Sequence, residues 1–200
     1  DDEVLLNSFG NGIFRMNTHT FQVDKLTILN DGAAKGYDQS VTLSCTDGEH
    51  LWMGTYSYGL ILFNLRTGET KNFSVSDGLP SNDVVAIEDD GNSHLWLSTS
   101  YGLVLFSLQD YTIRTFLMNE GINNLQFHEK SSLRDHKGTL YFGGNFGITY
   151  FSPNDIKKVD NLPFRVILEK LYIQNSPVSP ESGSGALSAA LPYTRKITLG

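Results

Sequence analysis

Short apolar runs separated by polar turns recur along the first three quarters of the chain. The run Leu60–Phe63 is apolar at four consecutive positions, and the segment Leu51–Met53 before it is apolar throughout. Strands that are covered on both faces show this pattern, because neither face needs polar side chains. The runs are too short for helices, rich in β-branched and aromatic residues and punctuated by glycines, so the pattern predicts β-strands.

The same pattern returns at a fixed interval. One recurring slot is occupied by Leu5, Trp52, Trp96 and Tyr141, at spacings of 47, 44 and 45 residues. Repeats of this length are typical of propeller blades or of helical repeats, and the strand propensities favour blades. We therefore expect an all-β fold, a partial β-propeller of about three and a half four-stranded blades with a period of about 45 residues.

Each blade is expected to have an inner strand A, two middle strands B and C, and an outer strand D. Asp-Gly or Lys-Gly pairs close the A–B hairpins, and a loop such as Ser76–Asn82 leads from strand D to the next strand A. The expected strands are Val41–Cys45, Val84–Glu88 and Glu129–Arg134 (A); Leu51–Thr55, Leu95–Thr99 and Leu140–Gly144 (B); Leu60–Asn64, Leu103–Ser107 and Ile148–Phe151 (C); Phe21–Ile28, Thr70–Val75 and Tyr111–Leu117 (D); and a worn first copy at Val4–Ser8 and Gly12–Met16.

The motifs LWMGT, GLILFNLRTGETKNF and DGLPSNDVVAIEDDGNSHLWLSTSYGLVLF follow one another between Leu51 and Phe106. This series resembles the two-component regulator propeller repeat, and the resemblance extends over residues 4–156. Residues 163–178 and 191–199 resemble the opening strands of the triple-tyrosine domain (Y_Y_Y), an immunoglobulin-like sandwich. The expected domains are therefore 1–160, an incomplete propeller, and 161–200, the truncated start of the sandwich, with a flexible loop at residues 182–190.

The resemblance also implies a function. Such repeats form the periplasmic sensor region of hybrid two-component systems, so the chain is expected to be a fragment of a membrane-anchored, dimeric sensor histidine kinase. It would sense an oligosaccharide and signal through a phosphorelay to regulate transcription. Kinase activity would lie elsewhere in the parent, with none in this fragment. Two alternatives remain open: a polysaccharide-active propeller enzyme, and a structural dimerisation scaffold that binds no ligand.

An incomplete propeller leaves apolar blade faces and strand edges uncovered. The sequence therefore predicts self-association, with copies that pair and could close a ring of seven or eight blades. The net charge of -7, from 15 Lys and Arg against 22 Asp and Glu, argues against a nucleic acid as partner of this fragment.

The chain offers little that could hold a metal or a cofactor. It has a single cysteine, Cys45, which excludes an internal disulfide and a paired-cysteine zinc site and is predicted to be a small buried apolar residue. His50 and His94 occupy equivalent slots and are predicted to be turn or edge residues, and no metal-binding histidine motif is present. We expect no cofactor, no metal and no catalytic residue. The large aromatics at positions 52, 96 and 141 are expected in the blade cores rather than on a sugar-stacking surface.

One set of side chains suits ligand binding. In a propeller, the B–C turns and the D–A loops emerge on the same face, and here they carry aromatic and amide side chains on a rigid scaffold, which suits carbohydrate or peptide recognition. The candidate ligand-binding residues are Tyr56, Tyr58, Tyr101, Asn145, Phe146, Asn82 and Asn124, with Tyr37, Asp38 and Gln126 beside them.

Overall fold

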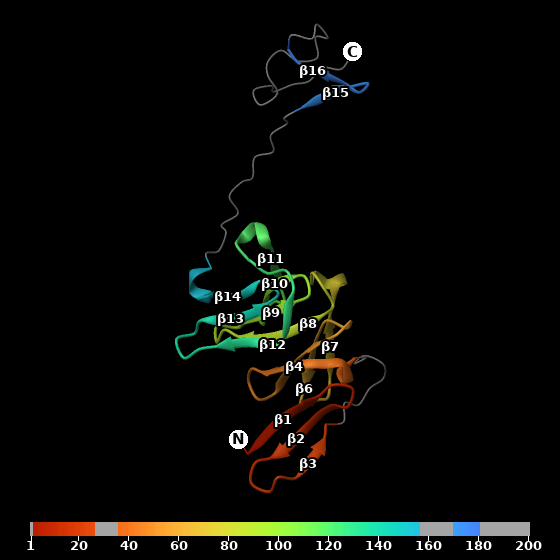
Figure 1. Cartoon of the computed structure of the whole chain (residues 1–200). Helices are drawn as coiled ribbons and strands as arrows, with labels where there is room; N and C mark the ends of the chain where they lie inside the picture. Colours follow the sequence, from red (N-terminus) through yellow and green to blue (C-terminus); the bar gives the residue numbers. More distant parts are fainter. Residues whose placement is uncertain (1, 27–35, 157–169, 181–200) are drawn as a thin grey trace. The chain divides into compact units, whose positions relative to one another are not determined.

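The structure is a computed structural model that describes residues 2–26, 36–156 and 170–180. The chain divides into two compact units, Asp1–Ile156 and Lys157–Gly200. The first unit contains four antiparallel sheets, which follow one another in chain order from red to cyan in Figure 1. Their strands are β1 (Glu3–Ser8), β2 (Gly12–Asn17) and β3 (Val23–Lys25); β4 (Ser40–Cys45), β5 (His50–Thr55), β6 (Leu60–Asn64) and β7 (Thr70–Phe73); β8 (Val84–Asp89), β9 (His94–Thr99), β10 (Gly102–Ser107) and β11 (Ile113–Phe116); and β12 (Phe127–Arg134), β13 (Leu140–Gly144) and β14 (Gly147–Phe151).

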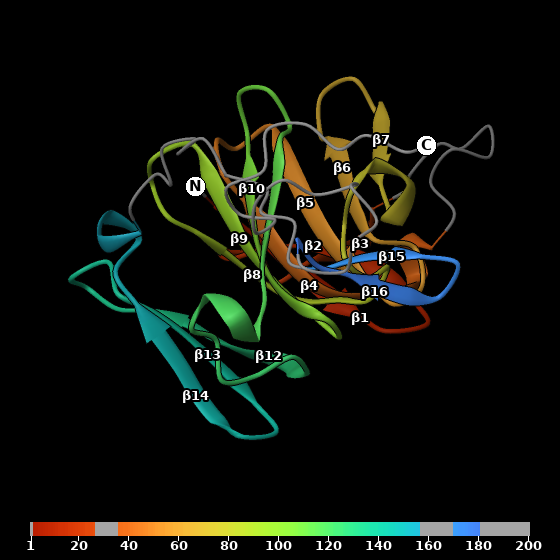
Figure 2. The ribbon, with the colours of Figure 1, turned by 90° about the horizontal axis from the view of Figure 1, so that it is seen from above.

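These sheets are the predicted propeller blades. In the two complete sheets the strands lie in the order A–B–C–D, as β4-β5-β6-β7 and β8-β9-β10-β11. The first sheet corresponds to strands B, C and D of a blade, and the fourth to strands A, B and C. The inner strands β4, β8 and β12 pack beside one another, and in Figure 2 the fourth sheet extends away to one side of the second and third. The all-β fold and the partial propeller are therefore confirmed.

The core lies between the sheets rather than within one of them. Successive side chains of a strand point to opposite faces, so one strand contributes to two interfaces. On β6, for example, Ile61 and Phe63 pack towards the first sheet, whereas Leu60 and Leu62 pack towards the third. This is why strands B and C are apolar at almost every position.

The recurring aromatic slot faces the next blade. Trp52 is buried between the second and third sheets, and Trp96 between the third and fourth. The prediction that these residues belong to the core is confirmed. Tyr141 occupies the same slot in the fourth sheet but is only half-buried, because no further sheet among the described residues of the first unit packs on that side. Its ring instead stacks on Tyr150, with the centroids 5.9 Å apart.

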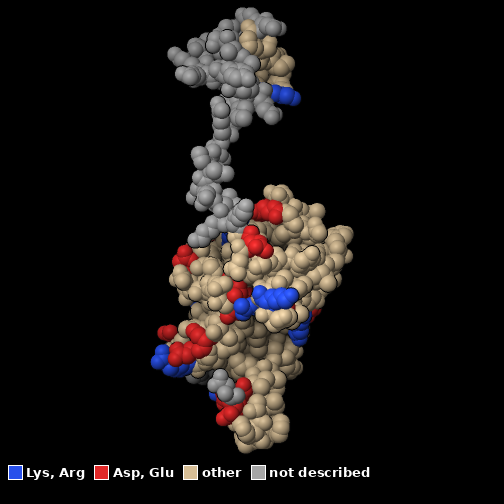
Figure 3. All heavy atoms as spheres, turned by 90° about the vertical axis from the view of Figure 1, so that its left-hand side faces the viewer, with Lys and Arg blue, Asp and Glu red and all other residues tan. Residues whose placement is uncertain are grey.

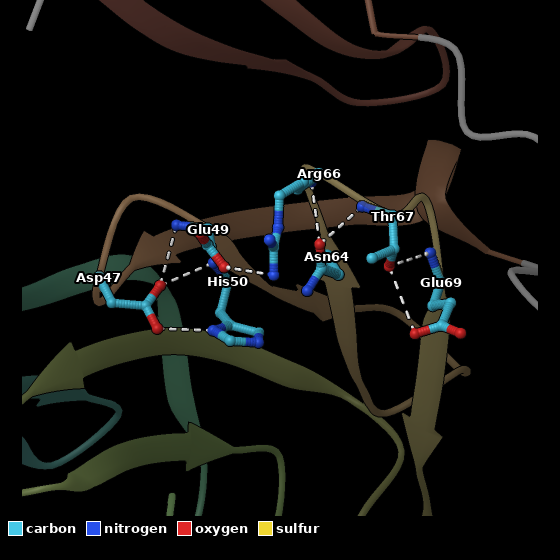
Figure 4. Close-up of polar contacts among 7 residues, drawn as sticks. All are labelled: Asp47, Glu49, His50, Asn64, Arg66, Thr67 and Glu69. Carbon is cyan, nitrogen blue, oxygen red and sulfur yellow. Dashed lines mark hydrogen bonds and ion pairs between the residues drawn. The ribbon is translucent and has the colours of Figure 1, made fainter.

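Local hydrogen bonds define the A–B turns, as the Asp-Gly pairs predicted. The Asp47 carboxylate accepts hydrogen bonds from the backbone N–H groups of Glu49 (2.9 Å) and His50 (2.7 Å), and it contacts the His50 ring (Figure 4). Burial opposes ionisation of Asp47, but these hydrogen bonds outweigh it, so the pKa of Asp47 is lowered. His94 pairs with Asp90 in the equivalent turn. The two histidines thus begin β5 and β9 and pair with an aspartate of the turn, in agreement with the prediction of turn or edge residues.

The C–D turn of the second sheet lies beside this A–B turn. The Asn64 side-chain oxygen accepts hydrogen bonds from the backbone N–H groups of Arg66 (2.9 Å) and Thr67 (2.8 Å), and Arg66 reaches Glu49 at 3.5 Å (Figure 4). Asn17 makes the same pair of bonds, to His19 and Thr20, in the first sheet. The turns are therefore built by repeated short-range contacts.

The outer strands are shorter than predicted. Phe21 and Tyr111 were expected to begin D strands, but their φ angles of 56° and 59° place them in left-handed turns, so β3 and β11 begin two residues later. The D strand of the second sheet ends at Phe73, because the hydroxyl of Ser74 begins a capped helical turn, Val75–Asp77. Residues 27 and 28 of the predicted first D strand lie outside the described residues.

Cys45 is exposed, so the prediction that it is a buried apolar residue is wrong. It is the last residue of β4, where the first and second sheets separate around a hollow of about 790 Å³ that Cys45 lines together with Glu3 and Arg15. The inner part of strand A is covered by its neighbours, but its end at the A–B turn is not.

In the second unit the structure describes a hairpin of β15 (Leu171–Ile173) and β16 (Ser176–Val178). Gln174 and Asn175 both have positive φ angles, as a two-residue hairpin turn requires. The assignment of residues 161–200 to the start of a sandwich stays a prediction, and its segments at 163–169, 182–190 and 191–199 lie outside the described residues. Within the described ranges, no helix has the length and hydropathy of a membrane span.

Candidate functional site on the loop face

The B–C turns and D–A loops share one face of the first unit, as predicted. We call this the loop face; it comprises the described parts of the B–C turns (residues 9–11, 56–59, 100–101 and 145–146) and of the D–A loops (36–39, 74–83 and 117–126). In each case a glycine of one blade's turn donates a backbone hydrogen bond to the loop that leads to the next blade. These bonds run from Gly10 to Asp38, from Gly59 to Asn82 and from Gly102 to Leu125, each at 2.7 Å.

A cleft of about 230 Å³ opens on the inner part of this face. It lies between the B–C turn of the second sheet, the D–A loop that leads into the third sheet, and the beginning of β12. Its floor includes the buried side chains of Val85 and Phe127. The polar side chains around it are Tyr56, Asp83, Ser100, Gln126, His128, Glu129 and Asn145. The cleft therefore combines one aromatic ring with amide, hydroxyl, imidazole and carboxylate groups.

Asp83 is held rigidly at the edge of the cleft. One carboxylate oxygen accepts a hydrogen bond from the backbone N–H of Ser57 (2.8 Å), and the other accepts from the hydroxyl of Ser100 (3.0 Å). These bonds join the turns of two neighbouring blades. The carboxylate has further lone pairs, so it can still accept hydrogen bonds from a ligand.

Tyr56 and Glu129 interact across the cleft. Partial burial, a hydrogen bond to Glu129 and the negative charges of Glu129 and Asp83 together raise the pKa of Tyr56 to about 12. The phenol therefore remains protonated over the whole physiological range and can act as a hydrogen-bond donor. On the other side of the cleft, the Asn145 amide donates to the side-chain oxygen of Gln126 at 2.7 Å.

A long bulge brings His128 and Glu129 to the cleft. In β12 the register shifts between Phe127 and Ser132, and Lys130 has a φ of 52°. The inner strands β4 and β8 have a smaller register shift at the same place. Bulges redirect side chains and are common beside functional sites. This bulge gives the fourth blade two cleft residues that the other blades lack.

The structure separates the seven predicted residues into three groups. Tyr56 and Asn145 line the cleft. Tyr58, Tyr101 and Phe146 are exposed on the loop face but lie outside the cleft lining. The third group, Asn82 and Asn124, holds the loops together. The Asn82 oxygen accepts from the Val75 N–H at 2.8 Å, whereas Asn124 is fully buried and bonds to residues 146 and 147. Ligand contact by any of the seven stays a prediction.

Four polar residues of the cleft were missing from the prediction: Asp83, Ser100, His128 and Glu129. A signal for the last two is present in the sequence. Thirteen positions separate Phe127 from Leu140, whereas eleven separate the equivalent Val84 and Leu95. The two extra residues fall within strand A and form the bulge. Asp83 and Ser100 have no comparable signal, because short polar residues are common in any loop.

The raised pKa of Tyr56 predicts a specific dependence of stability on pH. The phenol ionises near pH 10 in the unfolded chain but near pH 12 in the folded protein. Between these values the unfolded state binds fewer protons, so the contribution of Tyr56 is complete below pH 10 and is lost as the pH rises towards 12. The difference in unfolding free energy between the wild type and Tyr56→Phe, measured with urea, should be constant from pH 7 to 9 and shrink above pH 10. A difference that persists unchanged to pH 11.5 would contradict this assignment.

No group of three or more His, Cys, Asp or Glu side chains in the described part of the chain could hold a metal ion. What the cleft offers is a set of fixed hydrogen-bond donors and acceptors beside an aromatic ring. Such an arrangement can bind a ligand that carries several hydroxyl or amide groups.

Residues 78–101, which span a D–A loop and strands β8 and β9, match the family described as "Two component regulator propeller". Histidine kinase P4 from Formosa agariphila is 29% identical over the whole of this chain, which spans only 18% of that protein. The curated relative is thus several times longer than the chain.

Solved structures have the same fold. The extracellular domain of the hybrid two-component system BT3049 from B. thetaiotaomicron has a TM-score of 0.63 and 18% identity, covering 77% of this chain and 21% of that one. The corresponding domain of BT4673 from the same organism has a TM-score of 0.55 and 24% identity, covering 98% of this chain and 25% of that one. The resemblance to the propeller repeat is therefore confirmed: residues 78–101 match the two-component regulator propeller family, within blades that share the fold of the extracellular domains of hybrid two-component systems.

Proposed function

We propose that this chain is part of the ligand-sensing region of a hybrid two-component sensor, that it lies outside the cytoplasm, and that its ligand is an oligosaccharide. The observation that carries the proposal is the loop-face cleft, in which side chains from three blades converge. The similarity to a histidine kinase and to extracellular domains of two-component systems supports the setting. Signalling through a phosphorelay to transcription belongs to the same proposal for the parent protein.

The chemistry of the cleft suits a sugar. Hydroxyl groups of a sugar can donate to the carboxylates of Asp83 and Glu129 and accept from the amide of Asn145, while Tyr56 offers an apolar ring with a polar tip. At about 230 Å³ the cleft is smaller than the pockets of about 300–1,000 Å³ that enclose whole drug-sized ligands. It would therefore hold one end of an oligosaccharide.

The surface charge agrees with a neutral ligand. On the face drawn in Figure 3 most of the surface is uncharged, and acidic and basic side chains lie scattered on it. The cleft itself is lined by two carboxylates, Asp83 and Glu129, and by no lysine or arginine of the described residues. Anionic ligands would be repelled there, so nucleic acids and strongly acidic glycans fit the site poorly.

Isothermal titration calorimetry of the chain against a panel of neutral oligosaccharides tests the proposal. We expect one member to bind. Glu129→Gln should weaken that binding by about ten-fold or more, since a hydrogen bond to a charged group contributes about 1.5–3 kcal/mol, and Asn145→Ala should weaken it by about three- to ten-fold, since a neutral hydrogen bond contributes about 0.5–1.5 kcal/mol. Phe21→Ala, which removes an aromatic that is 70% exposed and lies away from the loop face, is the matched control and should change the affinity less than two-fold.

The outcomes separate the alternatives. Absence of binding across the panel would favour a scaffold that binds no ligand, and release of shorter products would favour a polysaccharide-active enzyme. Binding that survives both cleft substitutions would place the ligand elsewhere on the protein. For the parent, signalling requires that the ligand bind two states of the sensor with different affinities.

A further inference from the structure

Two exposed tyrosines occupy equivalent positions on the loop face. Tyr58 and Tyr101 come directly before the glycines that end the B–C turns of the second and third sheets, Gly59 and Gly102, and they are 37% and 52% exposed. Both sheets have a neighbouring sheet of the first unit on each side, so the surroundings of these turns do not depend on where the sequence begins or ends. The same slot in the fourth sheet holds a third exposed aromatic, Phe146.

Contacts among the described residues do not account for these two side chains. Neither phenol group makes a hydrogen bond there, and neither ring pairs with another ring or with a cation. By contrast, Tyr56 on the first of the two turns contacts Glu129 and the ring of Phe9, with the ring centroids 5.8 Å apart. Tyr58 is nonetheless fixed in place, because its ring packs so closely on Gly36 that a Cβ atom there would overlap it. The two turns thus present flat rings with a polar tip to a ligand.

The tyrosines adjoin the cleft. Two cleft residues lie on the same turns: Tyr56 is two residues before Tyr58, and Ser100 directly precedes Tyr101. The cleft, at about 230 Å³, would hold only one end of an oligosaccharide, so the remaining sugar units must lie on the surface around it. Sheets that pack face to face are about 10 Å apart, so a ligand that reaches from the cleft across both turns must contain several sugar units.

We propose that Tyr58 and Tyr101 bind the outer sugar units of the oligosaccharide whose end occupies the cleft, and that they make the site selective for longer chains. The inference rests on the proposed function. The C–H groups on one face of a sugar ring form an apolar surface that packs on an aromatic ring, while the sugar hydroxyls can bond to the phenol at its tip. The cleft then recognises the end of the chain, and the tyrosines add affinity only when the chain is long enough to reach them.

Isothermal titration calorimetry of the 200-residue chain tests the inference with cello-, malto-, xylo- and manno-oligosaccharides, each from the disaccharide to the hexasaccharide. In the series that binds, the affinity of the wild type should rise with chain length. Tyr58→Ala and Tyr101→Ala should each weaken hexasaccharide binding by about three- to ten-fold, as expected for one stacked ring, but change disaccharide binding less than two-fold. Glu129→Gln should weaken the binding of both ligands equally, because it acts in the cleft. Phe21→Ala, away from the loop face, is the matched control and should leave both affinities unchanged.

The outcomes distinguish this inference from the proposed function. A wild type that binds the disaccharide and the hexasaccharide equally well, or tyrosine variants that lose the same affinity at every length, would overturn the inference and leave the proposed function intact. Absence of binding in all four series would overturn both. Thermal unfolding checks that each variant is folded, and Tyr101→Ala decides the result if loss of the contact with Gly36 unfolds Tyr58→Ala.

Discussion

Replacing Trp96 with Ala is expected to lower the unfolding free energy by about 3–5 kcal/mol. Trp96 is 1% exposed and fills the interface between the third and fourth sheets. Its ring lies 5.3 Å from that of Phe116 and 4.5 Å from that of Phe151, measured between centroids. Truncation would leave a large cavity that these rigid sheets cannot close.

Urea or guanidinium unfolding followed by circular dichroism measures the loss. Trp96→Phe should cost much less, because it keeps most of the apolar volume and because the indole N–H has no hydrogen-bond partner among the described residues. Tyr141→Ala is the positional control: it changes the same repeat slot in the fourth sheet, where the side chain is only half-buried. Equal losses for Trp96→Ala and Tyr141→Ala would mean that the slot is not governed by packing between blades.

Gly59→Ala is expected to cost about 4 kcal/mol, although it adds a single methyl group. Gly59 has a φ of 81°, which an L-residue adopts only with strain of about 1–3 kcal/mol. A Cβ atom built there would lie 2.1 Å from the carbonyl oxygen of Phe73, so the backbone must also move, at a similar cost. The movement would weaken the 2.7 Å hydrogen bond from Gly59 to Asn82 that joins the second blade to the third.

Gly147→Ala separates the two causes. Gly147 ends the equivalent turn in the fourth sheet and has a φ of 108°, but no atom lies within 4 Å of the position that an added Cβ would take. It should therefore show the backbone strain alone, about 1–3 kcal/mol. Thermal or chemical unfolding measures the loss of stability in both variants. If Gly147→Ala is destabilised as much as Gly59→Ala, steric contact with Phe73 does not contribute to the effect at Gly59.

The strands of the blades could be predicted from the sequence because the repeat supplies several copies of the same evidence. Apolar runs such as Leu60–Phe63 identify strands covered on both faces, and the Asp-Gly pairs locate the turns between them. Strand ends are less predictable. The left-handed conformations of Phe21 and Tyr111 depend on the tight turns before β3 and β11, and nothing in their side chains signals a positive φ.

Exposure was harder to predict than strand position. Tyr141 occupies a slot that is apolar throughout the repeat, but its surroundings depend on what packs next to it in space. Cys45 shares its slot with Asp89 and Arg134 of the following sheets, so the repeat already contained a signal that this strand end is exposed. Cys45 lies where two sheets separate, and Tyr141 faces away from the other sheets of the unit. The repeat pattern of a single sequence predicts to which face of a sheet a side chain points. It does not predict whether another sheet packs against that face.

The candidate site was predicted in outline. The loop face and two cleft residues, Tyr56 and Asn145, follow from propeller topology. The cleft residues on β12 depend on a bulge, and its sequence signal is an insertion of two residues. The buried Asn124 shows the opposite difficulty: an amide in a loop suggests recognition, yet here its hydrogen bonds hold the loop against the B–C turn and β14 of the fourth sheet.

At each of the three junctions between neighbouring sheets, a glycine at the B–C turn donates a hydrogen bond to the following loop, above an apolar contact between the sheets; Gly59 and Gly102 occupy equivalent positions, and Gly10 fulfils this role at the first junction. A segment of about 45 residues therefore contains the residues that connect it to the segments before and after it. In evolution, duplication or loss of one such segment would change the number of blades without creating a mismatched junction. The two extra residues in β12 show how one copy can then diverge within strand A while its contacts to the neighbouring blade are retained.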